Sequence, residues 1–164
     1  MLTKPDLEES LRRVHEWIRS ADEKVSIFLA LQGVALTILF PKVFSWTEDN
    51  FDKFSCLDFF ILLMGMVLIA ISLCKSVFAI IPSLDKKKHK KSMTYFGDIA
   101  EFKLEDFQKM VEGASDKEYG EELINQIYIS SGIAKKKHTQ FREAITAFFG
   151  GIILLALSFF IFRI

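Results

Sequence analysis

Two short stretches and two single residues carry side chains that could bind a small polar ligand. Residues 21–24 (ADEK) place an acid and a base on one helical turn, and residues 95–100 (YFGDIA) put two aromatic rings beside a carboxylate. An amide and an ammonium group follow later in the chain. Aromatic faces beside carboxylate and amide groups suit a nucleobase, because the base stacks on the ring while the polar groups bond to its edge. The candidate ligand-binding residues are Asp22, Lys24, Tyr95, Asp98, Gln126 and Lys137.

The same residues have a purely structural interpretation. Tyr95 and Phe96 can be core residues at a corner between helices, with Asp98 capping one of them. The sequence leaves this choice open. Polar contacts from a later helix, by Ser130 and Ser131 beside Gln126, would favour the ligand site.

Catalytic chemistry is not expected. The sequence contains no nucleophile elbow, P-loop, GxGxxG, HExxH or paired His/Asp metal motif. His15, His89 and His138 stand far apart among charged neighbours, which is typical of solvated positions. We therefore expect neither an enzyme nor a cofactor or metal site. The net charge is zero, with 21 basic and 21 acidic residues, so a nucleic-acid polymer is not an expected partner.

Charge is segregated along the chain in a way that a soluble domain of this size does not show. Residues 25–41, 59–74 and 144–162 contain no Asp, Glu, Lys or Arg. Each block is long enough to cross a bilayer, or nearly so with flanking residues that snorkel. The fold class that follows is all-α: an integral membrane protein with three transmembrane helices and a helical cytoplasmic region.

The expected organisation alternates polar and apolar helical segments. An amphipathic cytoplasmic helix at 1–24 runs without interruption into a first span at 25–41, which should stop near Pro41. An external loop at 42–58 leads to a second span at 59–81, which Pro82 ends. A cytoplasmic helical region at 82–143 contains a short helix near 104–112 and a longer one from 116, separated by Gly113, Ala114 and Ser115. The longer helix feeds directly into the third span at 144–162.

Topology follows from the distribution of lysine and arginine. Residues 1–24 and 75–143 hold eighteen of the 21 lysines and arginines. Because cytoplasmic segments carry the excess of positive charge, the N-terminus is expected inside and the C-terminus outside. The basic run at 86–91 and the cluster at 135–138 then lie beside span ends, where anionic lipid attracts each charge by about 1 kcal/mol. Phosphate binding by one of them is the alternative.

Small residues mark one face of each span. Ser26, Ala30, Gly33 and Thr37 recur in the first span, and seven-residue repeats of small residues occur in the other two. Such faces permit close helix packing, within one protomer or between protomers. Gln32 needs a hydrogen-bond partner near mid-membrane, which could be a neighbouring backbone, another protomer or a pore. Gln32 and Gly33 are the residues that we associate with membrane rearrangement.

The order of three short motifs resembles a known family. They read WIRSADEK at 17–24, YFGDI at 95–99 and NQIYIS at 125–130, the last continuing through Lys137 into the third span. This layout is similar to the transmembrane effectors of bacterial Pycsar antiphage systems, and the resemblance covers nearly the whole chain.

The resemblance implies a multi-pass protein of the bacterial inner membrane that acts in antiviral defence by abortive infection. The activating ligand would be a cyclic pyrimidine mononucleotide, cyclic CMP or cyclic UMP, made by a partner cyclase. Binding would rearrange a homo-oligomer in the lipid bilayer and impair the membrane. No β-barrel for cyclic nucleotides fits in this chain, so the cytoplasmic helices would have to form the site. The alternatives are a membrane-anchored adaptor that docks a protein partner, and a related short effector of a cyclic-oligonucleotide system.

Overall fold

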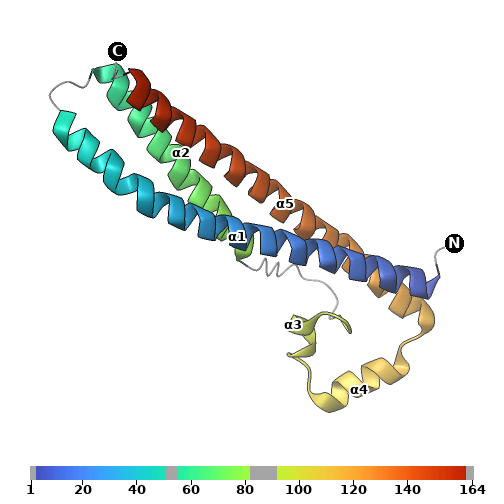
Figure 1. Ribbon diagram of the computed structural model, residues 1–164. Helices are drawn as coiled ribbons and strands as arrows, with labels where there is room; N and C mark the ends of the chain where they lie inside the picture. Colours follow the sequence, from blue (N-terminus) through green and yellow to red (C-terminus); the bar gives the residue numbers. More distant parts are fainter. Residues whose placement is uncertain (1–2, 51–54, 82–91, 162–164) are drawn as a thin grey trace. The chain divides into compact units, whose positions relative to one another are not determined.

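The computed structural model describes residues 3–50, 55–81 and 92–161, and these form five helices with no strand among them. Figure 1 shows their order along the chain. The helices are α1 (Lys4–Asn50), α2 (Cys56–Ile80), α3 (Phe96–Ile99), α4 (Leu104–Gly113) and α5 (Asp116–Ile161). Helices α1, α2 and α5 are long and apolar enough to cross a membrane. The expected fold class, an all-α protein with three spans, is confirmed.

The chain divides into two compact units. The polar unit comprises residues 1–20 and 83–136, and the membrane unit comprises residues 21–82 and 137–164. Helices α1 and α5 contribute a segment to each unit, whereas α2 belongs to the membrane unit alone. As expected, no break separates the polar segments of α1 and α5 from their apolar segments. The positions of the membrane boundaries stay predictions.

Helix α1 does not stop near Pro41, so that expectation was wrong. Figure 1 draws α1 as one helix, and it includes Pro41 and ends at Asn50. Proline removes one backbone hydrogen bond, but packing of the following turns compensates for the loss. Val43 is buried, and the ring of Trp46 lies 4.3 Å from that of Phe159. Part of the segment expected as a loop is therefore helical.

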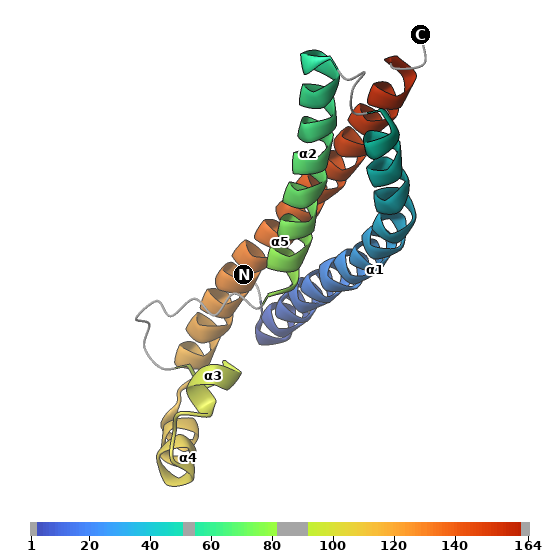
Figure 2. The ribbon, with the colours of Figure 1, turned by 90° about the vertical axis from the view of Figure 1, so that its left-hand side faces the viewer.

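Helices α2 and α5 pack closely against each other in the membrane unit, side by side in Figures 1 and 2. A Cβ atom added to Gly151 would stand 2.8 Å from the carbonyl oxygen of Gly65, so the two backbones nearly touch. Seven residues away along each helix, the Ser72 hydroxyl donates to the Ala144 carbonyl at 2.6 Å. After seven more residues, the Lys137 ammonium donates to the Ala79 carbonyl at 2.7 Å. The two helices thus keep an antiparallel seven-residue register, as in coiled coils.

The small-residue faces of the three helices differ in burial. Those of α2 and α5 are buried against each other and hold the protomer together. On α1, by contrast, Ser26, Ala30, Gly33 and Thr37 are all exposed. A Cβ atom added to Gly33 would meet nothing within 4 Å. This face of α1 does not hold the described protomer together.

The polar unit is built on the first turns of α1 and α5, which run parallel. The Lys4 ammonium donates to Asp116 at 3.1 Å, and the Tyr119 hydroxyl donates to Glu8 at 3.3 Å. Val14 and Leu123 form part of the core of this unit. The short helix expected near 104–112 is confirmed as α4, and the expected break follows it at Ala114 and Ser115.

Candidate functional site

Three of the predicted ligand-binding residues, Tyr95, Asp98 and Gln126, meet at one buried serine, Ser92. Its backbone N–H donates to the Asp98 carboxylate at 2.8 Å. Its hydroxyl oxygen accepts from the backbone N–H of Tyr95 at 2.9 Å and from the Gln126 amide at 3.0 Å. Asp98 thus links α3 to the segment before it. This resembles the structural interpretation, in which Asp98 caps a helix.

Glu122 of α5 also bonds to Ser92 and to the neighbouring Thr94. Its carboxylate accepts from the hydroxyl of Ser92 at 2.5 Å and from the backbone N–H of Thr94 at 2.9 Å. The Thr94 hydroxyl also donates to it, at 3.0 Å. We call Ser92, Thr94, Asp98, Glu122 and Gln126 the Ser92 cluster. It fixes the chain before α3 against α5 through polar contacts rather than apolar packing.

An open groove of about 440 Å³ adjoins the Ser92 cluster at Thr94, within the polar unit. One wall is a face of α1, and the opposite wall comes from α5 and Thr94. The lining combines guanidinium, imidazole, carboxylate, phenol and aliphatic groups. These residues are Glu8, Leu11, Arg12, His15, Glu16, Arg19, Thr94, Tyr119 and Leu123.

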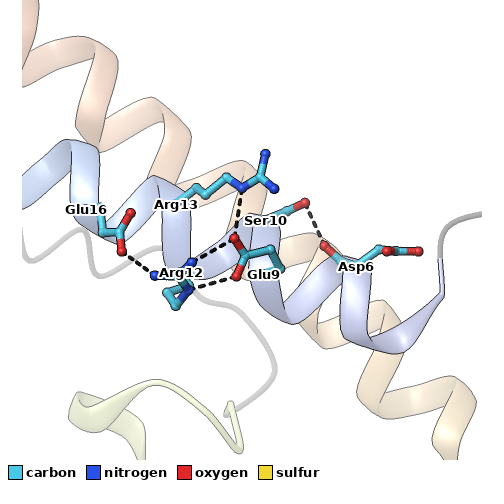
Figure 3. Close-up of polar contacts among 6 residues, drawn as sticks. All are labelled: Asp6, Glu9, Ser10, Arg12, Arg13 and Glu16. Atoms are coloured by element: carbon cyan, nitrogen blue, oxygen red, sulfur yellow. Dashed lines mark hydrogen bonds and ion pairs between the residues drawn. The ribbon is translucent and has the colours of Figure 1, made fainter.

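Arg12 lines this groove, and Figure 3 shows the carboxylates that hold its side chain. Its guanidinium donates to both oxygens of Glu9, each at 2.8 Å, and to Glu16 at 2.5 Å. Arg13 reaches the same Glu9 carboxylate at 3.0 Å but does not line the groove. Among the described residues these bonds use three of the five N–H donors of Arg12. The guanidinium is thus oriented and still able to donate to an anionic ligand.

The pKa shifts of Glu9, Arg12 and Tyr119 follow from their contacts. Hydrogen bonds from Arg12 and Arg13 lower the pKa of Glu9 from 4.5 to about 2, so this carboxylate stays charged. The Glu9 carboxylate in turn raises the pKa of Arg12. Burial, followed by the charge of Glu8, raises the pKa of Tyr119, so its phenol remains a donor. The Lys4 ammonium lies 4.6 Å from the centre of the Tyr119 ring.

The arrangement can hold a small molecule that combines an anionic group with a flat polar ring. Arginine donors suit the anion because the guanidinium matches phosphate geometry. Carboxylates and hydroxyls at the edge of a ring accept from or donate to its exocyclic groups. Leu11 and Leu123 supply an apolar floor.

Asp22 and Lys137, also predicted as ligand-binding, lie in the membrane unit and bind each other. The Lys137 side chain is 7% exposed, and its ammonium donates to Asp22 at 2.5 Å as well as to the Ala79 carbonyl. Through these two bonds Lys137 links α5 to both α1 and α2. Lys24, the remaining candidate, is exposed on α1.

Gln32 is fully buried and bonded within its own protomer. Its amide donates to the Ser72 hydroxyl at 2.6 Å, and that hydroxyl donates to Ala144. Within the described chain, the partner of the amide group is therefore a side chain of α2. Gly33, one residue later, is exposed.

Some of the residues singled out in the sequence lie outside the part of the chain that the structure describes. They are the basic run at 86–91, including His89, and the side chain of Phe96. In the cluster at 135–138, Lys135, Lys136 and His138 are exposed whereas Lys137 is buried.

Sequence reasoning missed most of the groove, although a signal was present. Arg12, His15 and Arg19 are spaced by three and four residues, which places them on one side of a helix. That polar face looked like an ordinary solvated surface. Tyr119 lines the same groove from a helix about a hundred residues further along the chain. Periodicity alone does not show that these two helices lie together.

Comparison with known proteins supplies one match. A family model described as the Pycsar effector protein domain matches residues 6–163. No curated protein and no solved structure matches the chain.

Proposed function

The chain belongs to the Pycsar effector protein family, a family of transmembrane effectors with an antiphage role, and from that premise we propose how it acts. It binds a cyclic pyrimidine mononucleotide, cyclic CMP or cyclic UMP, in the groove of the polar unit. A partner cyclase makes this ligand. Binding then impairs the integrity of the bacterial inner membrane and causes growth arrest or death of the infected cell.

The observation that carries this proposal is the composition of the groove. A cyclic mononucleotide presents one phosphodiester anion, a compact sugar and a flat base. Arg12 and Arg19 suit the anion, Tyr119 offers a ring beside the base, and Glu8 or Glu16 can accept from an amino or imino group of a pyrimidine. The volume, about 440 Å³, gives room for a ligand of this class.

Membrane impairment is supported by the continuity of α1 and α5. Both helices run from the groove-lining segment into an apolar segment long enough to span a bilayer. A ligand moves such a system only by preferring the active arrangement, and a shift from 1:99 to 99:1 needs about 5.5 kcal/mol of differential affinity. A homo-oligomer whose protomers switch together shares that requirement, and the exposed face of α1 at Gly33 is the surface available for it.

The orientation belongs to the same proposal. With the N-terminus and residues 82–143 in the cytoplasm, the groove faces the compartment in which a cyclase makes its product. The C-terminus then lies outside the inner membrane. The excess of lysine and arginine in the polar segments supports this orientation.

A thermal-shift titration of the detergent-purified protein tests ligand binding directly. Cyclic CMP, UMP, AMP and GMP are compared with linear monophosphates. At a hundredfold excess over its dissociation constant, a ligand raises stability by about 2.7 kcal/mol, which is readily measured. A selective increase with one cyclic pyrimidine is expected. No shift across the whole panel would contradict the mononucleotide proposal.

Arg12 and Arg13 provide a matched pair for locating the site. Both bind Glu9, but only Arg12 lines the groove. A lost charge-assisted hydrogen bond costs about 1.5–3 kcal/mol, so Arg12→Ala should weaken binding by roughly tenfold to a hundredfold. Arg13→Ala should bind as the wild type does. Equal losses in both variants would place the ligand elsewhere.

Expression in cells separates the proposal from its alternatives. The effector should be harmless alone and toxic together with its cyclase. Toxicity that needs a protein partner and no nucleotide would identify an adaptor instead. Toxicity on expression alone would identify a constitutive membrane toxin.

A further inference from the structure

One wall of the groove in the polar unit is not part of a long helix. Among the described residues that line the groove, only Thr94 lies on neither α1 nor α5. It is an exposed residue of the short non-helical segment that precedes α3. Such a segment has no helical hydrogen bonds, so side chains must hold its backbone in place. The way in which Thr94 is held therefore decides what this wall offers to a ligand.

The hydroxyl of Ser92 supports this segment and has no bonding capacity left. Its oxygen accepts from the backbone N–H of Tyr95 at 2.9 Å and from the amide of Gln126 at 3.0 Å. These two bonds use both of its lone pairs. Its one proton is donated to the Glu122 carboxylate at 2.5 Å. The buried serine is thus a structural support and not a contact for a ligand.

Both donors of Thr94 are bound to the same carboxylate. Its backbone N–H donates to Glu122 at 2.9 Å, and its hydroxyl donates to the same oxygen at 3.0 Å. The Ser92 hydroxyl lies 3.3 Å from that of Thr94, but each of these hydroxyls has a shorter bond to Glu122 for its single proton. What remains on Thr94 is the accepting capacity of its hydroxyl oxygen.

The charge of Glu122 fixes the direction of this hydrogen bonding. A free hydroxyl rotates to suit either a donor or an acceptor. A bond to a carboxylate is roughly twice as strong as a bond between neutral groups, so the Thr94 proton stays on Glu122. A ligand group that needs a donor at this wall would have to break that bond. A ligand group that carries a proton meets an oxygen ready to accept it.

We propose that Thr94 determines the specificity of the groove by accepting a hydrogen bond from the ligand, and that Glu122 is the positioning residue that keeps Thr94 an acceptor. This inference rests on the proposed function. In a cyclic pyrimidine nucleotide, the donor is an N–H group of the base or the free hydroxyl of the ribose. Tyr95 and Gln126 then act on the groove through Ser92.

Binding of ligands with and without the donor tests this role in the purified full-length protein. Cyclic CMP and cyclic UMP are compared with two analogues of each, one methylated so that the base has no N–H donor and one with deoxyribose. Leaving a bonding partner unsatisfied costs about 1–3 kcal/mol, so the wild type should bind one analogue at least about fivefold more weakly than the parent nucleotide. The analogue that loses affinity identifies the base or the sugar as the source of the donor.

Thr94→Val keeps the shape of the side chain and removes the hydroxyl. The ratio of the two affinities, parent over analogue, should therefore fall towards one in this variant, whereas Thr94→Ser should keep the ratio of the wild type. A purely structural role of Thr94 would weaken parent and analogue equally and leave the ratio unchanged. An unchanged ratio in Thr94→Val would overturn the proposal, even where both affinities fall.

Glu122→Gln tests the positioning role, because the amide of glutamine can donate to Thr94 and release its proton. The affinity ratio should again fall towards one. Glu121→Gln is the matched control, since Glu121 is exposed and pairs with Lys117 at 3.9 Å on the same helix. It should keep the ratio of the wild type, and equal ratios in the two glutamine variants would refute the role of Glu122. If the wild type binds none of the nucleotides, the proposed function fails and this inference fails with it.

Discussion

The ion pair between Asp22 and Lys137 should be the most consequential charge interaction in the membrane unit. The Lys137 side chain is 7% exposed and Asp22 is 40% exposed, so loss of the carboxylate leaves a buried ammonium with one carbonyl partner. Breaking a fully buried pair costs about 3–5 kcal/mol and an exposed pair is worth up to about 1 kcal/mol. For this half-buried pair, Asp22→Asn should cost about 2–3 kcal/mol.

The pair between Lys75 and Glu143 provides the matched control. It joins α2 to α5 at 2.7 Å, whereas the Asp22 pair joins α1 to α5, and its side chains are 42% and 46% exposed. Both partners rehydrate when the pair is broken, so Glu143→Gln should cost less than about 1 kcal/mol. The two substitutions have the same chemistry and differ mainly in burial.

The assay is thermal unfolding of the purified protein in one detergent. For a chain of this size, 1 kcal/mol corresponds to about 2–4 °C, so Asp22→Asn should lower the midpoint by about 4–12 °C. Adding Lys137→Met should recover part of that loss, because no unpaired charge then remains. Equal shifts for Asp22→Asn and Glu143→Gln, or no recovery in the double variant, would refute the reasoning.

Three further predictions use the same thermal assay. Gly151→Ala should lower the stability by about 1–3 kcal/mol, because its methyl group would stand 2.8 Å from the carbonyl oxygen of Gly65. Gly33→Ala, where nothing lies within 4 Å, should be neutral or slightly stabilising. Similar effects of the two substitutions would contradict the packing. Ser72→Ala should cost about 1–3 kcal/mol because it strands a buried amide, and Thr146→Ala, whose hydroxyl bonds only to its own helix, should change stability by less than about 0.5 kcal/mol. The lowered pKa of Glu9, about 2 against an ordinary 4.5, predicts a stabilisation that is complete above pH 4.5 and is lost as the pH falls towards 2. The midpoint of Glu9→Gln should therefore fall less steeply than that of the wild type across this window, and parallel curves would exclude the ion pairs as its cause.

The spans could be predicted from the sequence because their signal is local. An apolar block about as long as a bilayer is thick has few alternatives to a membrane helix. The end of α1 could not be predicted in the same way. Pro41 is the strongest helix breaker in the first block, but burial of Val43 and the contact of Trp46 with Phe159 continue the helix beyond it. Phe159 lies on a helix more than a hundred residues away, and the cluster that buries Val43 combines residues of α2 and α5.

The candidate site illustrates the same limit. Tyr95, Asp98 and Gln126, chosen as ligand-binding candidates because a short aromatic and acidic turn and a polar helix face are visible in the sequence, all contact Ser92. Their role in ligand binding stays a prediction. The residue that joins them, Ser92, has no distinguishing pattern of its own. Lys137 is predicted from the sequence as a ligand-binding residue within a basic cluster near a span end, whereas its ammonium is buried and bound to Asp22. A single sequence does not reveal which lysine of a cluster turns inward.

The three spans do not resist movement equally. Helices α2 and α5 meet backbone to backbone at Gly65 and Gly151, and their register repeats along the seam, so sliding one past the other breaks contacts at every level. Helix α1 is hydrogen-bonded to them through Asp22 and Gln32, both in the half of the unit nearer Lys137.

In the other half of the membrane unit, a groove of about 410 Å³ lies between α1 and α2, with a wholly apolar lining that includes Leu36, Phe40 and Val43. Lipid chains are as apolar as these side chains, so moving α1 here exchanges one apolar contact for another at little cost. Helix α1 also contributes Arg12 and Arg19 to the groove of the polar unit. A movement of α1, as the proposed function requires, therefore meets least resistance in the apolar half of the unit. The same movement of α5 would have to separate Gly151 from Gly65.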